Sequence, residues 1–139
     1  MKRVFQRLNA FLSDETIVVV DIGDALFGAT DLFIHRRTEL LGPAYYASMG
    51  FAVPAAIGGT VGQSGAPPAG HCWRWGVSDD RMEIATAVRN NLNPIVVVLN
   101  NAGYGTERHI HNGPYNDILP REYSRLPEVL GSGHGFVAR

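Results

Sequence analysis

Two short apolar runs place the strongest constraint on how this chain folds. Residues 16–20 and 95–99 are rich in β-branched side chains without polar alternation, a pattern typical of strands buried on both faces of a parallel sheet. Helical spacing or small-residue composition predicts helices at residues 2–12, 45–59, 82–92 and 123–130, the second with a possible kink at Pro54. The sequence therefore predicts an α/β fold in which helices flank a parallel sheet.

The composition is that of one globular domain. The 139 residues include 45% apolar and 18% charged side chains with a formal net charge of -1. This argues against disorder and gives no basis for binding nucleic acid or an anionic membrane. The single cysteine, Cys72, excludes an internal disulfide, and no apolar run is long enough to span a bilayer. We expect one domain over residues 1–139, cytoplasmic, with a small-molecule ligand.

Both apolar runs end in polar turns that contain glycine, at residues 21–24 and 100–105. The carboxyl ends of parallel strands lie at one edge of a sheet, where ligands of such folds bind. The residue pattern alone predicts a binding site at this edge and does not define its ligand.

The second turn lies in Leu-Asn-Asn-Ala-Gly-Tyr-Gly-Thr-Glu, residues 99–107. This segment resembles the second half of the thiamine-diphosphate motif, in which Asn-Asn follows an upstream Gly-Asp-Gly. Asn-Asn-Ala-Gly is also an ordinary strand-ending turn, but the strand before it and the glutamate after it favour the resemblance. The resemblance implies thiamine diphosphate and Mg²⁺ as cofactors. Asn101 and the Gly103 carbonyl would bind the metal, and Tyr104 would lie beside the cofactor.

Glu107 narrows the resemblance to pyruvate, indolepyruvate and phenylpyruvate decarboxylases. In these enzymes a glutamate at this spacing lies over the reactive thiazolium carbon and helps to protonate the intermediate that remains after carbon dioxide leaves. The structural alternative is that Glu107 only stabilises the first turn of a helix. Acetolactate-synthase-like carboligases of the same superfamily generally lack this glutamate, and they are the alternative within the superfamily.

The resemblance also assigns cofactor contacts upstream. Gly23 and Asp24 match a turn whose backbone N–H groups reach the diphosphate, although many members have a hydroxyl residue in place of Asp24 and an acid is unfavourable beside phosphate. Ala47, Ser48 and Met49 match the segment that holds the aminopyrimidine. There the Ala47 carbonyl would accept a hydrogen bond from its amino group, and Met49 would wedge the cofactor into its bent form. Ordinary core packing is the alternative for Met49.

Residues 63–81 depart from the family pattern. A buried strand and Gly-Asp-Gly are expected there, but the stretch contains both tryptophans, the cysteine and a Pro-Pro pair. The position of the metal-binding aspartate holds Arg74, whose charge repels Mg²⁺. Because proline is excluded from central strands, we expect a poorly ordered segment without an apolar strand.

The genetic code offers an explanation for this stretch. With permitted synonymous codons, residues 73–81 read one base later become Gly-Asp-Gly-Ala-Phe-Gln-Met-Thr-Gly. Two compensating single-base shifts would leave the length unchanged. A natural loop of unusual sequence is the alternative.

The resemblance covers residues of about 4–62 and 82–138. It implies part of a lyase that converts a 2-oxo acid into an aldehyde and carbon dioxide, in a homo-oligomer whose neighbouring subunit supplies the pyrimidine-binding domain. That domain and the family's last strand and helix have no counterpart here, so we expect a truncated domain that is inactive alone. A degenerate, non-catalytic domain is the alternative.

Overall fold

The computed structural model describes residues 2–14, 16–34, 39–43, 45–62, 72–75 and 82–131. Its α-helices are α1 Lys2–Phe11, α2 Asp24–Ala29, α3 Ala52–Gly62, α4 Glu83–Arg89, α5 Gly105–Ile110 and α6 Leu126–Val129. Its strands are β1 Ile17–Val20, β2 Glu39–Leu41, β3 Cys72–Trp75 and β4 Ile95–Val97. Two 3-10 turns, η1 Pro114–Asn116 and η2 Tyr123–Arg125, lie near the C-terminal end of the described chain.

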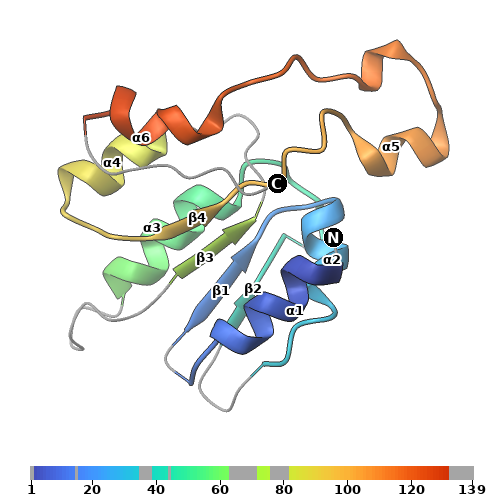
Figure 1. The fold of residues 1–139 in the computed structure, drawn as a ribbon. Coiled ribbons are helices and arrows are strands. Elements are labelled where there is room, and N and C mark those ends of the chain that lie inside the picture. Colours follow the sequence, from blue (N-terminus) through green and yellow to red (C-terminus); the bar gives the residue numbers. More distant parts are fainter. Residues whose placement is uncertain are drawn as a thin grey trace.

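The four strands form one parallel sheet in the order β2-β1-β3-β4 (Figure 1). Ile17 pairs with Glu39 on one side and with Cys72 on the other. At the far end, Trp75 pairs with both Val20 and Val97. All four carboxyl ends therefore lie at the same edge, and the prediction of an α/β fold with a parallel sheet is confirmed.

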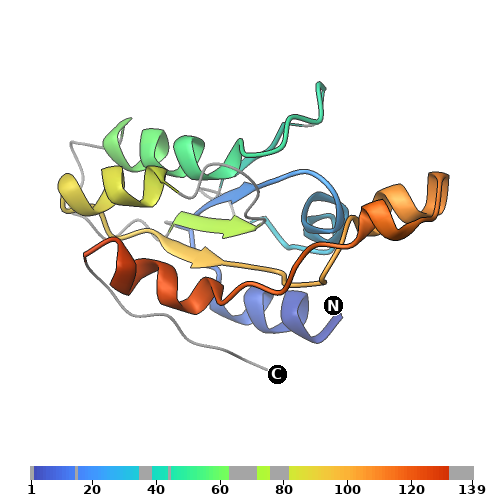
Figure 2. The same cartoon turned by 90° about the horizontal axis from the view of Figure 1, so that it is seen from above.

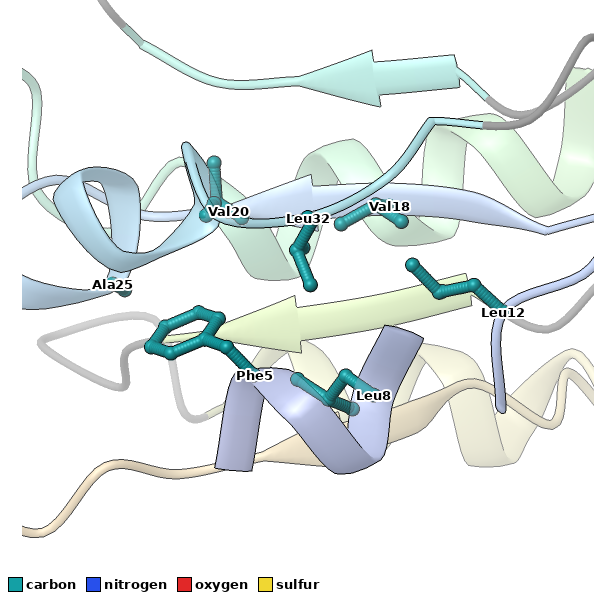
Figure 3. Close-up of a cluster of buried hydrophobic side chains, with 8 residues drawn as sticks. Phe5, Leu8, Leu12, Val18, Val20, Ala25 and Leu32 are labelled. Carbon is teal, nitrogen blue, oxygen red and sulfur yellow. The ribbon is translucent and has the colours of Figure 1, made fainter. Parts of the chain in front are cut away.

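The core forms on both faces of β1, whose four residues are all buried. Val18 and Val20 face one side and Ile17 and Val19 the other, as the alternation of a strand requires. Figure 2 shows the helices divided between the two faces, with α3 and α4 on one and α1 on the other. The partners on the α1 side, most of them labelled in Figure 3, are Phe5, Leu8, Leu12, Ala25, Ala29 and Leu32; those on the α3 side include Ala52 and Ala56.

The close contact between α1 and α2 depends on one glycine. Phe5, which is 3% exposed, packs over Gly28, where an added Cβ would lie 2.0 Å from the phenyl ring. Burial of a side chain of this size stabilises the fold by about 1.5–3 kcal/mol. Gly28 thus sets how deeply the amphipathic helix α1 sits on the sheet, and so supports β1 from that side.

The predicted helix at 45–59 begins later than expected, at Ala52. The preceding residues form turns, with positive φ angles of 52° at Ala47 and 84° at Gly50, which no helix contains. Pro54 is the third residue of α3, and it is tolerated there because the first-turn N–H groups have no partner within the helix.

Residues 63–81 were expected to lack an apolar strand, yet Cys72–Trp75 occupy a strand position despite their composition. These residues form the central strand β3, hydrogen-bonded to β1 and β4. The physical reason is that the backbone groups of two neighbouring strands need a partner, and tryptophan suits a strand. The remaining positions of the stretch, 63–71 and 76–81, lie outside the described residues, and so does the expectation of poor order there.

The other predicted elements are present but shorter. The run at 95–99 is a strand over Ile95–Val97, the helix at 82–92 is Glu83–Arg89, and the one at 123–130 is η2 followed by α6. Four elements without a prediction, α2, β2, α5 and η1, have only three to six residues, too few to show a periodic pattern.

Candidate functional site

The turns that follow β1 and β4 meet at the carboxyl edge of the sheet. The Asn101 side chain donates a hydrogen bond from Nδ2 to Oδ2 of Asp24 at 2.8 Å. The Asp24 carboxylate also lies against Gly105, where an added Cβ would be 2.7 Å from Oδ2. Next to it, the Cβ position of Gly23 is 3.7 Å from the Thr106 hydroxyl. The prediction that the Gly23 and Asn101 turns share one edge is therefore confirmed.

Gly23 stands at the start of α2 with φ 85° and ψ -144°, a conformation that is essentially limited to glycine. The chain leaves β1 and reverses at this residue into α2. Because glycine has no Cβ, no side chain at this position covers its backbone N–H. The glycine that suggested a ligand-binding turn in the sequence is therefore also required by the backbone conformation of this turn.

The loop after β4 is held by the side chain of Asn101, which lies within it, and by the backbone of Asn116, which follows it in the chain. Gly103 N–H donates to Asn101 Oδ1 at 3.4 Å, so both ends of the Asn101 amide have a partner. Ala102 has a left-handed φ of 58°, and Gly103 is buried. Tyr104 is 42% exposed, and its backbone N–H donates to the Asn116 carbonyl at 2.9 Å.

Asp21, to which the sequence assigned no role, lies beside these turns. It directly follows β1 and is 3% exposed. Its carboxylate accepts hydrogen bonds from the backbone N–H groups of Ile22 at 2.9 Å and Gly50 at 3.1 Å. A carboxylate immediately after a fully buried strand was the available signal. Asp21 connects the end of β1 to the segment predicted to hold the aminopyrimidine.

That segment lies at the surface. Ala47, Ser48 and Met49 are exposed, and the Ala47 N–H donates to the Pro43 carbonyl at 2.9 Å. Met49 is 55% exposed, so the alternative that it is an ordinary core residue is wrong. Its predicted role as a wedge stays a prediction.

Glu107 is the third residue of α5 and lies in its first turn. Its side chain is exposed, and its backbone carbonyl accepts a hydrogen bond from His111 N–H at 2.9 Å. A place in the first turn of the helix agrees both with the catalytic assignment of Glu107 and with the helix-stabilising alternative. Its place on the helix that starts beside Asp24 brings it to the same edge as the two turns.

Residues 21–125 match the family described as thiamine pyrophosphate enzyme, C-terminal TPP binding domain. The chain belongs to this family. The match includes both strand-end turns and the segment between them, and it confirms the resemblance drawn from Asn101 and its neighbours.

The relatives that this chain matches are named as decarboxylases. The chain is 30% identical over 132 residues to an alpha-keto-acid decarboxylase of Mycolicibacterium paratuberculosis, covering 94% of this chain and 23% of that protein. It is 31% identical over 130 residues to the Mycobacterium tuberculosis alpha-keto-acid decarboxylase (92% and 23%). It is 28% identical over 136 residues to a probable pyruvate decarboxylase of Schizosaccharomyces pombe (98% and 24%). The chain thus spans about a quarter of the length of the curated relatives it matches.

The residues of this thiamine pyrophosphate enzyme domain, as they stand, do not suit a magnesium ion. Mg²⁺ prefers an octahedral shell of hard oxygens and gives up its waters reluctantly. Position 74 offers arginine, and the Asp24 carboxylate already accepts from Asn101. Across the described ranges, no three His, Cys, Asp or Glu side chains gather as a metal-binding group. The oxygens of Asn101 and Gly103 alone do not fit Mg²⁺.

Among its described residues the domain has no helix with the length and apolar character needed to cross a membrane.

Proposed function

We propose that this domain binds thiamine diphosphate between the turns after β1 and β4, as part of a decarboxylase that converts a 2-oxo acid into an aldehyde and carbon dioxide. The observation that carries the proposal is the hydrogen bond between Asn101 and Asp24. It joins the two turns that the resemblance assigns to one diphosphate, although they are far apart in sequence. The names of the relatives support the reaction class.

Thiamine diphosphate, when bound, supplies the electron sink for loss of carbon dioxide. In the proposal, the backbone at Gly23 binds a phosphate oxygen and Met49 orients the rings from the opposite segment. The Ala47 carbonyl accepts a hydrogen bond from the aminopyrimidine, next to Ser48. Glu107 donates a proton to the substrate carbon that has lost carbon dioxide, a task suited to a positioned carboxyl group.

The rest of the assignment follows the resemblance. We propose that Tyr104 lies beside the cofactor and that the active protein is a cytoplasmic homo-oligomer acting on a small 2-oxo acid. Magnesium is the metal expected for the family, with Asn101 and Gly103 as its ligands once an aspartate stands at position 74.

A second candidate is a domain without catalysis, and Arg74 is the observation that favours it. A cation in place of the metal-binding aspartate opposes the metal that would neutralise the diphosphate. The two candidates make opposite predictions about the effect of restoring the aspartate.

A pair of chimaeras tests the proposed function. The matched quarter of the Mycobacterium tuberculosis relative is replaced by this chain, once unchanged and once reframed, with Gly-Asp-Gly-Ala-Phe-Gln-Met-Thr-Gly at residues 73–81. We expect release of carbon dioxide from 2-oxo acids, in the presence of thiamine diphosphate and Mg²⁺, from the reframed chimaera alone. A folded, cofactor-binding reframed chimaera without decarboxylation would support the non-catalytic candidate. Equal activity of both chimaeras would show that Arg74 does not block the site.

A further inference from the structure

Helix α5 has little to hold it in place apart from polar contacts. None of its six residues is buried, and Figures 1 and 2 both show it projecting beyond the carboxyl end of the sheet. Among the elements of the described residues, the 3-10 turn η1 packs on it. Since apolar burial does not fix α5, the position of Glu107 depends on hydrogen bonds and charge pairs.

The chain after α5 folds back as a short strap, residues 113–118, along the loop after β4. Gly103 and Asp117 form an antiparallel bridge. On either side of the bridge, Tyr104 N–H donates to the Asn116 carbonyl at 2.9 Å, and Ile118 N–H donates to the Ala102 carbonyl at 3.0 Å. The strap therefore pairs with the same loop that contains the predicted metal ligands.

Arg108 joins the helix, the strap and the loop. Its guanidinium forms an ion pair with Asp117 of the strap, and Nη1 donates to Asn112 Oδ1 at 3.4 Å. Nη2 also lies 2.8 Å from the position of an added Cβ at Gly103, so the guanidinium packs directly over that glycine. One side chain thus contacts all three segments.

Asn116 completes the connection from the other end. It is 3% exposed, and its Nδ2 donates to the carbonyl of His111, the residue after α5, at 2.8 Å. An added Cβ at Gly103 would lie 2.6 Å from the Asn116 carbonyl oxygen. A side chain at position 103 would therefore push the strap away, which gives Gly103 a packing role besides its carbonyl.

We propose that Arg108 and Asp117 form a clamp that positions Glu107 and the loop at residues 101–104 relative to each other. Arg108 is a positioning residue, and its catalytic consequence rests on the role proposed above for Glu107. Half-exposed ion pairs contribute little to overall stability, so the clamp acts locally. The planar fork of arginine suits contacts to Asp117 and Asn112 at once, which lysine does not reproduce.

Hydrogen exchange on the 139-residue chain tests the clamp. The variants are Arg108→Gln, Arg108→Lys, Asp117→Asn and the double variant Arg108→Gln with Asp117→Asn. The matched control is Arg125→Gln, which removes the exposed ion pair between Arg125 and Glu122. The reporters are the amides of Tyr104 and Ile118, with the amides of β1 as a measure of global unfolding.

We expect the amides of Tyr104 and Ile118 to exchange about tenfold faster in Arg108→Gln, Asp117→Asn and Arg108→Lys. The exchange rates of the β1 amides should stay unchanged. The double variant should match the single ones, because either change opens the same clamp. Full protection in Arg108→Lys or Arg108→Gln, or equal acceleration in β1, would overturn the proposal. The exchange result decides the clamp without any cofactor, and the pair of chimaeras decides the proposed function, so a failure of one is distinguishable from a failure of the other.

Discussion

Asn101 donates a hydrogen bond to Asp24 at 2.8 Å across 77 residues of sequence. Parallel strands bring the two residues together, because each follows a strand whose carboxyl end lies at the same edge. The contact also places a carboxylate at the diphosphate site proposed above, and this has a measurable consequence.

Asp24→Asn should strengthen binding of inorganic pyrophosphate. The amide keeps an oxygen that accepts from Asn101 and removes a negative charge, which at a surface site is worth on the order of 1 kcal/mol, or about fivefold in affinity. Calorimetric titrations at low and high salt measure the effect, which salt should weaken. Asp31→Asn, at the other end of α2, controls for net charge. Equal gains in both variants would contradict a local effect of Asp24.

Glu107→Gln should reduce decarboxylation by the reframed chimaera by about 10²-fold or more, as expected for loss of a positioned acid–base group. Cofactor affinity should stay nearly unchanged, because the exposed side chain lies outside the two turns. Steady-state kinetics and cofactor titration measure the two quantities. Glu128→Gln changes a first-turn acid of α6 and should leave turnover intact. Near-normal turnover in Glu107→Gln would favour the helix-stabilising alternative.

The unchanged chain should show no magnesium-dependent binding of thiamine diphosphate at micromolar cofactor. Asn101 and Gly103 supply neutral oxygens only, and magnesium retains its waters against such ligands. Replacing residues 63–81 by the shifted reading frame should restore an apolar strand before the Gly-Asp-Gly at residues 73–75, and so raise the melting temperature. Titration calorimetry measures cofactor binding and scanning calorimetry measures the melting temperature, each for the unchanged chain and for the chain with the shifted reading frame. Tight binding by the unchanged chain, or no rise in melting temperature, would falsify the frameshift account.

Gly28→Ala should lower the free energy of unfolding by about 1–3 kcal/mol, the usual effect of overpacking a core. The added methyl would meet the Phe5 ring at 2.0 Å. Gly58→Ala is the matched control, since within the described part of the chain no atom beyond its neighbours and its own helix backbone lies within 4 Å of its Cβ position in α3. There alanine should stabilise by about 0.5–1 kcal/mol. Urea unfolding of both variants checks the opposite signs.

How much could be read from the sequence depends on the length of each element. The runs around Val18 and Val96 are fully apolar and sit beside long amphipathic or small-residue segments, so the parallel sheet was predictable. β2 has three residues and no distinctive composition, so only its pairing with β1 reveals it. β3 was missed because its sequence departs from a buried strand, while its two neighbours still require a partner.

The candidate site likewise contains residues that were recognisable from the sequence and contacts that were not. Gly23 and Asn101 were recognisable because polar, glycine-bearing turns follow apolar runs. The hydrogen bond from Gly50 N–H to Asp21 and the ion pair between Arg108 and Asp117 were not recognisable, because they join residues that no local pattern relates. Tertiary geometry decides which carboxylate holds a backbone segment and which faces a ligand.

The burial of β1 and the exposure of α5 imply different timescales on the two sides of the site. Every residue of 16–21 is at most 7% exposed, so we expect amides there to exchange only when the whole domain unfolds. Helix α5 has no buried residue, and we expect it to open by local fluctuations that leave the sheet intact. The strand that leads into the Gly23 turn should therefore stay closed over times in which the helix that carries Glu107 opens and recloses many times.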